Sequence, residues 1–399
     1  MILLNAPMVF WLVSVSFMLF QFFLQLSSGL VINCLTKDIT LSAYEAGFLA
    51  SAYYYVYATL QVPVGMLFDK KSVRMLLTLN ALICSIGCIS FAYSNSLVGL
   101  TVSRLIMGTG SAFAFVGVAH ILRVHFEVKE FGFMIGLSET LAFLATVIFM
   151  FIMAIIKGQV LWRSLMFYSG ICGLIITLFC FFLLPKEPPA SHSEYSVLAA
   201  LGKLCLDKVA WFNGLYIGAG FGVITVFGAM WAIPFIQLKT GCNIKIASVV
   251  DAALFLGAGF GCPLYGKLEL YTKSRKWMMF LAYFITAILF LLTLFAATTS
   301  IITMSILMFA IGIISASYIV TFNIANEIAP PKAASTSAGF TNMFGVLTAP
   351  LLQPFIGYLL DSYKHGSKYT LIDYQISLLV IPISLLIAAV LGFYLPEKE

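Results

Sequence analysis

Long apolar runs separated by short polar segments dominate the chain. A bilayer core about 30 Å thick needs about 20 apolar residues in a helix that rises about 1.5 Å per residue. None of the runs shows the short alternating pattern of a transmembrane β-strand, so the pattern predicts an all-α membrane protein. Twelve runs are long enough to span the bilayer, at 7–33, 41–67, 75–93, 97–122, 131–156, 165–184, 209–237, 246–268, 277–296, 299–323, 333–360 and 374–395.

Composition supports this interpretation and excludes several classes of protein. Of the 399 residues, 61% are hydrophobic and only 10% are charged, whereas soluble proteins have roughly 45–50% apolar and about 25% charged residues. So few charges cannot cover a water-facing surface, which excludes a soluble enzyme. No basic run with interleaved aromatic residues suggests a nucleic-acid groove. The expected surroundings are the lipid bilayer, with no nucleic-acid partner.

Residues that could hold a metal or carry out catalysis do not form a recognisable set. The eight cysteines lie mostly inside apolar runs, and the four histidines lie at or beyond predicted helix ends. Neither residue type shows metal-ligand spacing. A phosphate-binding G-x-x-x-x-G-K-[ST] loop is also missing from the sequence. We therefore expect no metal, no cofactor and no enzymatic activity, and an ATP-driven pump is disfavoured.

The chain divides into two similar halves. We interpret 185–208 as a cytoplasmic linker between an N-terminal six-helix bundle at 1–184 and a C-terminal six-helix bundle at 209–399, with a short interfacial helix over Val197–Leu206.

Three sequence matches between the halves recur at an offset of roughly 200 residues: Pro63–Gly65 with Pro263–Gly266, Lys70–Arg74 with Lys273–Lys276, and Phe131–Glu139 with Ala334–Asn342. Such a repeat is typical of secondary transporters with the solute site between the halves.

Loop charges predict the orientation. With both termini on the same side, the loops of that side hold twice as many Lys and Arg residues as the loops of the other side. Cytoplasmic loops carry the excess of positive charge. Both termini and the 185–208 linker are therefore expected in the cytoplasm.

Two motifs resemble those of a known family. Gly65–Arg74, GMLFDKKSVR, resembles the G-x-L-x-D-[RK]-x-G-x-[RK] signature of the Major Facilitator Superfamily, and Arg104–Ala112, RLIMGTGSA, resembles its R-x-x-x-G-x-G-x-[AG] motif. The resemblance covers the whole chain. It implies two pseudo-symmetric six-helix halves that transport a solute by alternating access. It also implies a monomeric, multi-pass protein of a bacterial-type inner (plasma) membrane.

The first motif implies a cytoplasmic gate formed by Gly65, Asp69, Lys70 and Arg74. Gly65 permits close helix approach, and Asp69 can pair with cations and with a helix N-terminus when the inner side is closed. Such pairs bias a two-state equilibrium and do not touch the solute. A solvated cluster of inner-loop charges is the alternative interpretation.

The sequence departs from the family pattern in both halves. Ser72 occupies the usual glycine position in the first half. In the second half Leu270 stands where the acid is expected, and Glu269 comes one place early. We therefore expect the first-half gate to be the better formed. The 131–156 run also lacks the G-x-x-x-G-P-x-x-G-G motif of the family's antiporters, which favours uptake over drug or metabolite efflux.

Three ionisable residues inside predicted helices are functional candidates, because a charge there costs on the order of 2.5–3.5 kcal/mol on insertion scales. Arg104 either ties helices together through backbone carbonyls or binds solute. Glu139 is the better coupling candidate, because burial disfavours its ionised form; hydrogen bonding to a neighbouring segment is the alternative. Asp251 is the second coupling candidate. It lies near the start of the 246–268 helix, where we expect its charge mainly to interact favourably with the helix dipole.

Polar side chains on apolar helices suggest a substrate path. Gln21, Gln25 and Ser28 form one stripe on the first predicted helix, and such a stripe must face protein or a water-filled cavity. Interhelical hydrogen bonding and core packing are the alternatives. Further candidates for the path are Tyr53, Tyr57, Gln61, Trp231 and Asn323.

The sequence predicts a secondary active transporter of a small polar organic solute, coupled to protons as a symporter. One buried Arg with one buried Glu suits a carboxylate-bearing or zwitterionic solute, such as an amino acid, a dipeptide or a polycarboxylate. Phosphate esters are disfavoured, because related organophosphate exchangers place cations in the first and seventh helices, which lack Lys and Arg here. A proton-independent facilitator or exchanger of a neutral, sugar-like solute is the alternative, and an efflux antiporter is the third possibility.

Overall fold

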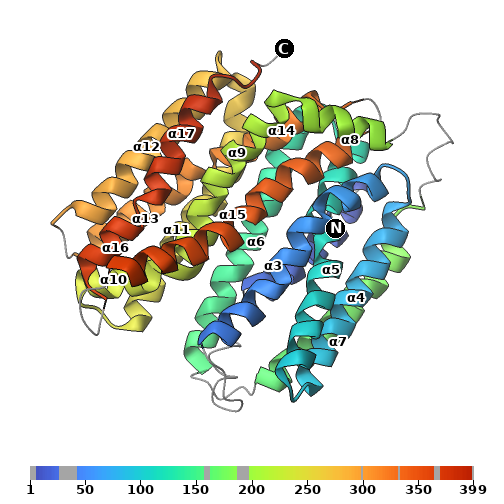
Figure 1. The fold of residues 1–399 in the computed structure, drawn as a ribbon. Helices are drawn as coiled ribbons and strands as arrows, with labels where there is room; N and C mark the ends of the chain where they lie inside the picture. Colours follow the sequence, from blue (N-terminus) through green and yellow to red (C-terminus); the bar gives the residue numbers. More distant parts are fainter. Residues whose placement is uncertain are drawn as a thin grey trace, which may run out of the picture. The chain divides into compact units, whose positions relative to one another are not determined.

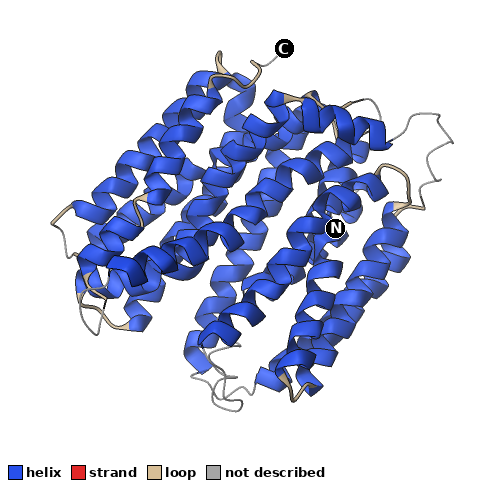
Figure 2. Cartoon of the chain, in the orientation of Figure 1, coloured by secondary structure: helices blue, strands red, loops and turns tan. Residues whose placement is uncertain are grey.

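The protein folds into helices joined by short loops. The structure is a computed structural model that describes residues 6–26, 43–156, 162–186, 197–297, 300–330, 333–363 and 369–397. Within these ranges all regular structure is helical and no strand occurs (Figure 2). Eleven helical runs are long and apolar enough to cross a membrane, and a further 26-residue helix, α3 (Ala43–Phe68), occupies the second predicted span. The predicted all-α membrane fold is confirmed.

The chain forms two compact units. Unit 1 comprises Met1–Phe131, Ile148–Leu204 and Ala329–Met343; unit 2 comprises Gly132–Val147, Cys205–Ile328 and Phe344–Glu399. Helices α6 and α15 therefore each contribute residues to both units.

The helices of the first half follow the predicted runs closely, as the blue-to-green part of Figure 1 shows. The short helix predicted over Val197–Leu206 forms as α8. The end of the 7–33 run lies outside the described residues. The bounds are α1 (Ala6–Leu26), α3 (Ala43–Phe68), α4 (Val73–Tyr93), α5 (Leu97–His125), α6 (Val128–Ile156), α7 (Trp162–Leu183) and α8 (Val197–Leu206).

Three helical runs of the second half change character along their length. The seventh run contains a π-helical stretch, the tenth contains a 3₁₀ turn, and the last is divided by a turn between α16 and α17. The bounds are α9 (Lys208–Gly222), η1 (Val223–Trp231), α10 (Ala232–Thr240), α11 (Ile244–Tyr271), α12 (Arg275–Phe295), α13 (Ile301–Ser315), η2 (Ala316–Ile319), α14 (Val320–Glu327), α15 (Ala334–Tyr363), α16 (Leu371–Ser377) and α17 (Val380–Gly392).

Similar helix pairings occur within the two units. In unit 1, α3 packs against α5 and α4 packs against α7; in unit 2, α11 packs against α13 and α12 packs against α17 (Figure 1). Close approach in unit 1 depends on small residues of the RLIMGTGSA motif. A Cβ on Gly108 would lie 2.6 Å from the carbonyl oxygen of Tyr53. The matching pairs agree with the repeat of roughly 200 residues seen in the sequence.

Candidate functional site

Arg104 is the centre of a buried polar cluster in unit 1. Its residue is 3% exposed, and its Nη1 atom donates to the carbonyl oxygen of Leu24 on α1 at 3.0 Å. The guanidinium also lies over the ring of Tyr53, 5.0 Å from its centroid. A buried arginine held by a carbonyl and an aromatic face keeps its charge at membrane depth.

The glutamines of α1 belong to the same cluster. Gln21 donates from Nε2 to Gln25 Oε1 at 2.6 Å and approaches the Tyr53 hydroxyl at 3.4 Å. Both glutamines are almost fully buried, and the Tyr57 ring stacks on Tyr53 at 5.8 Å between centroids. The structure therefore brings together four of the predicted path residues around Arg104. Ser28, predicted for the same stripe, lies outside the described residues.

Gln61 lies eight residues after Tyr53 on α3 and makes different contacts. It donates to the carbonyl oxygens of Tyr57 and Ala112, each at 3.3 Å, and accepts at Oε1 from Asn342 Nδ2 at 2.8 Å. With three protein partners, Gln61 ties α3 to α5 and to the start of α15.

Glu139 projects from α6 into the interior of unit 2. Its residue is 3% exposed, and Oε2 has no hydrogen-bond partner among the described residues. The sequence repeat matches Glu139 with Asn342, whose amide donates to Gln61. Glu139 instead lies near the thiol of Cys262, which itself contacts the Tyr318 hydroxyl at 3.4 Å. The carboxylate thus lacks the amide partner that satisfies its counterpart in the repeat.

Asp251 corrects the expectation drawn from the sequence. The helix α11 begins at Ile244, so Asp251 lies about two turns inside it and not in its first turn. Helix-dipole effects fall off within the first turn. The residue is 1% exposed, and neither Oδ atom has a hydrogen-bond partner in the described parts of the chain. Asp251 is therefore a second buried, unpaired carboxylate.

Trp231 and Asn323 are separate features of unit 2. Trp231 ends the π-helical stretch η1, with its Nε1 atom buried and lacking a described partner, and its ring lies 6.3 Å from that of Tyr374. Asn323 donates to Glu269, which places it in a charged cluster and not beside Trp231.

Asp69, at the end of α3, holds the start of α15 within unit 1. Its carboxylate accepts from the backbone N–H groups of Ser335 and Thr336 at 3.0 and 2.8 Å and from the Thr336 hydroxyl at 2.7 Å. Arg123 lies 3.8 Å from the same carboxylate. A Cβ on Gly65 would overlap the Ser335 carbonyl oxygen, so the glycine allows this approach.

The other two members of the predicted gate set do not join Asp69. Lys70 is exposed, and the Arg74 guanidinium lies over the Phe181 ring at 5.1 Å. Two residues that were not predicted, His120 and Arg123, contact the Ser335 hydroxyl at 3.1 and 2.8 Å. Their spacing of three residues on one helix face was the available signal.

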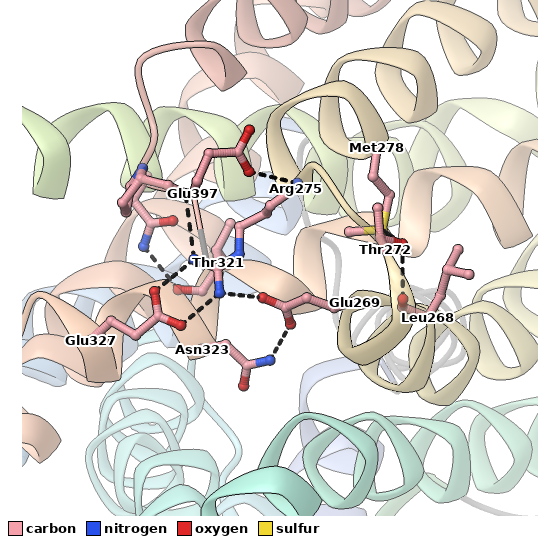
Figure 3. A network of polar contacts seen from close by, with 11 residues as sticks. Leu268, Glu269, Thr272, Arg275, Met278, Thr321, Asn323, Glu327 and Glu397 are labelled. Carbon is pink, nitrogen blue, oxygen red and sulfur yellow. Dashed lines mark hydrogen bonds and ion pairs between the residues drawn. The ribbon is translucent and has the colours of Figure 1, made fainter. Parts of the chain in front are cut away.

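A second charged cluster lies in unit 2 and was underestimated from the sequence. Arg275 makes a bidentate pair with Glu327, both N···O distances being 2.6 Å, and an ion pair with Glu269 at 2.6 Å (Figure 3). Asn323 donates to the other oxygen of Glu269. The sequence led us to expect the first-half gate to be the better formed, whereas the second-half cluster holds two ion pairs at 2.6 Å and Asp69 lies 3.8 Å from Arg123. Glu269, one residue earlier than the family pattern, thus contacts both α12 and α14.

The C-terminal segment joins this cluster. Glu397 accepts from the Ser274 hydroxyl at 2.5 Å. It also accepts from the backbone N–H of Arg275 at 2.8 Å (Figure 3). Desolvation raises the pKa of the Glu397 carboxyl, but these hydrogen bonds, together with the backbone N–H and the charge of Lys276, hold the pKa below its ordinary value. The carboxylate thus caps the N-terminus of α12. In the described parts of the chain, no group of three His, Cys, Asp or Glu side chains is placed to hold a metal ion.

A polytopic helical protein with an internal repeat and buried charges on its helices has the architecture typical of secondary transporters. The sequence profile of the Major Facilitator Superfamily matches residues 10–352. The chain therefore belongs to the Major Facilitator Superfamily, and it is a transporter and not an enzyme.

Individual relatives are distant. The probable galactarate/D-glucarate transporter GudP of Escherichia coli (strain K12) is 24% identical over 369 residues, covering 82% of this chain and 81% of that protein. The probable sulfoacetate transporter SauU of Cupriavidus necator is 24% identical over 214 residues, covering 53% of this chain and 48% of that one. The crystal structure of the Escherichia coli fucose:proton symporter FucP aligns with a TM-score of 0.72 at 15% identity, covering 98% of this chain and 100% of that one. The last match supports the fold alone.

Proposed function

We propose that the protein is a secondary active importer of a small organic anion with two acidic groups, working as a proton symporter by alternating access. The observation that carries the proposal is the buried Arg104 cluster in unit 1. One fixed cation can bind a carboxylate, and the neighbouring Gln21, Gln25 and Tyr53 offer neutral donors and acceptors for the remaining polar groups of the solute.

The relatives support the choice of solute class. Galactarate, D-glucarate and sulfoacetate, the compounds in the names of two relatives, are small acids that each carry two acidic groups. This class lies within the carboxylate-bearing solutes that the pairing of one buried Arg with one buried Glu favours. D-glucarate is therefore the probe to use first.

The buried Glu139 supports proton coupling. An unpaired carboxylate away from water favours its neutral form, so it can take up a proton on one side and release it on the other.

Asp69, beside the N-terminus of α15, would bias the cytoplasmic gate without touching solute. We further propose a monomer in a bacterial-type inner membrane, with both termini in the cytoplasm and with bundles at 1–184 and 209–399 joined by the 185–208 linker.

Binding to the purified protein tests the solute site. Arg104→Gln removes the charge but keeps a hydrogen-bonding side chain, and we expect D-glucarate affinity to fall about 10- to 100-fold, since a hydrogen bond to a charged group contributes about 1.5–3 kcal/mol. Arg163→Gln is the matched control, because Arg163 donates to the carbonyl oxygens of Ala92 and Ser94. Parental affinity in Arg104→Gln would remove Arg104 from the solute site.

A facilitator of neutral, sugar-like solutes is the second candidate, favoured by the amide and hydroxyl groups of Gln21, Gln25 and Tyr53. Competition separates the two candidates. If L-fucose, a neutral sugar, displaces bound D-glucarate poorly and Arg104→Gln weakens only the acid, the anion carrier is supported. Strong binding of L-fucose that is insensitive to Arg104→Gln would favour the facilitator.

A further inference from the structure

Within unit 2, α6 and α11 pack against each other along one face of each helix. The contacts run in antiparallel order, with residue numbers rising on α6 as they fall on α11. The contacting pairs are Gly132 with Gly266, Gly136 with Cys262, Thr140 with Gly259, and Phe143 with Phe255. Small residues bring the two backbones together at the first three levels: a Cβ on Gly136 would lie 2.6 Å from the carbonyl group of Cys262, and the Thr140 hydroxyl donates to the carbonyl oxygen of Gly259 at 2.5 Å.

Both unpaired carboxylates continue this contact face. Residues three or four apart lie on the same side of an α-helix. Asp251 precedes Phe255 by four residues, and Glu139 follows Gly136 by three and precedes Phe143 by four. Glu139 therefore lies at the level of Gly259 on α11, and Asp251 lies about 12 Å further along that helix at about 1.5 Å per residue.

The two acids share the same electrostatic situation. Asp251 is 1% exposed and Glu139 is 3% exposed, and neither has an ion-pair partner among the described residues. The titratable groups that interact with Glu139 are the Cys262 thiol from α11 and the Tyr318 hydroxyl from η2. For Asp251 the described elements supply no charged or titratable group within interacting range. Both acids therefore favour the protonated form in this arrangement, because an isolated carboxylate is costly at membrane depth.

An aromatic pair separates the two acids. The rings of Phe143 and Phe255 lie 6.2 Å apart between centroids, and both residues are at most 1% exposed. They occupy the level between Glu139 and Asp251 on the shared face. With these buried rings and about 12 Å of helix between them, the two carboxyls cannot share one proton, so each binds a proton as its own site.

We propose that the α6–α11 contact is a two-proton site, with one proton bound at Asp251 and one at Glu139. At each position a carboxylate and a proton form a neutral carboxylic acid on the side of uptake, and the acid releases that proton on the other side. Two protons balance the two negative charges of a doubly acidic solute, so that transport is electroneutral. This last step rests on the proposed function; the existence of two proton sites does not.

Infrared difference spectroscopy on the reconstituted protein tests the two sites without any solute. The parent is expected to show two pH-dependent signals of protonated carboxyl groups. Asp251→Asn should remove one and Glu139→Gln the other, while Asp251→Glu should restore a shifted signal. Asp373→Asn is the matched control, because Asp373 is equally buried but accepts from the Thr370 backbone. A spectrum of Asp251→Asn that equals the parental spectrum across the pH range overturns the proposal.

Counting protons tests the role in transport. In proteoliposomes at zero membrane potential, the proton-to-glucarate ratio is expected to be two in the parent and in Asp373→Asn, and one in Asp251→Asn. A ratio of one in the parent, or of two in Asp251→Asn, contradicts the proposal. Glucarate exchange without a pH gradient reports on the proposed function separately. If the parent shows no exchange, the solute assignment fails, and the infrared signals alone decide on the two proton sites.

Discussion

At the scale of single residues, Asp69 shows how one carboxylate can connect distant parts of the chain. The first N–H groups of a helix lack partners within that helix. Asp69 accepts from two of them at the start of α15, where the partial positive charge of the helix also favours an anion. Its contacts with Arg123 and the Thr336 hydroxyl make these interactions depend on the negative charge.

Asp69→Asn is therefore expected to keep the shape of the side chain but to lose about 1–2 kcal/mol of interaction with α15. Asp69 shares no described contact with the Arg104 cluster. D-glucarate affinity should therefore stay unchanged while the rate of turnover falls severalfold. Binding and transport assays on the same preparation measure the two quantities. Asp361→Asn is the control, since Asp361 accepts only from the nearby Tyr369 in the described contacts. Parental turnover at all solute concentrations would show that Asp69 is not part of a gate.

Single residues also show where prediction from the sequence stopped. The carboxylates at 69, 139 and 251 and the arginine at 104 could be selected because charge is rare in this chain. The partners could not be predicted, because they come from other helices far along the chain, as with Arg104 and Leu24 or Asp69 and Ser335. Asp251 differs from its expectation for a local reason: even the predicted start at 246 places it beyond the first turn, and the helix begins still earlier, at Ile244.

At the scale of helices, the α6–α11 contact depends on glycines, which have no side chain. A Cβ on Gly266 would overlap the carbonyl oxygen of Gly132. The two helices could not keep their spacing if either residue were larger, because packed interfaces resist added volume.

Gly266→Ala is expected to lower the unfolding free energy by about 1–3 kcal/mol, as overpacking does. Gly202→Ala in α8 provides the control, because a Cβ there meets nothing within 4 Å. That change should be neutral or stabilise by about 0.4–1 kcal/mol. Thermal unfolding in detergent compares the two variants, and equal midpoints would show that the close approach is not needed.

The charged cluster at the ends of α11, α12 and α14 gives a graded prediction. Arg275 has a side chain 2% exposed and pairs with Glu269, equally buried, and with Glu327, which is 42% exposed. Arg275→Gln leaves the Glu269 carboxylate buried without its cation and should cost about 3–5 kcal/mol. Glu327→Gln should cost much less, because water screens the exposed partner. Thermal unfolding of both variants tests this order, and the reverse order would contradict the assignment.

Helix positions were predictable to within a few residues because about 20 consecutive apolar residues leave little choice of structure in a bilayer. Irregularities within the helices were not. The π-helical stretch Val223–Trp231 and the 3₁₀ turn Ala316–Ile319 lie within long, mainly apolar runs. Their tertiary contacts are also not visible in the local sequence: the carbonyl oxygen of Thr225, for example, accepts from Gln353 on α15 at 2.8 Å.

At the scale of the whole molecule, the proposed transporter has an anion site at Arg104 and proton sites at Glu139 and Asp251. The family and the repeated helix pairings follow from the sequence and the fold. The solute and its coupling to protons are proposals that depend on a few buried charges. A test of the proposed function therefore has to measure solute transport and proton transport together.

Uphill accumulation of D-glucarate in proteoliposomes is the most direct such measurement. With an imposed inward proton gradient of one pH unit and no membrane potential, the parent should concentrate labelled D-glucarate, and a protonophore should abolish the accumulation. Glu139→Gln should accumulate about tenfold less while exchange without a gradient is unchanged, because one proton per pH unit corresponds to a factor of about ten. Accumulation in the parent that is equal with and without the gradient, although exchange occurs, would contradict proton-coupled transport.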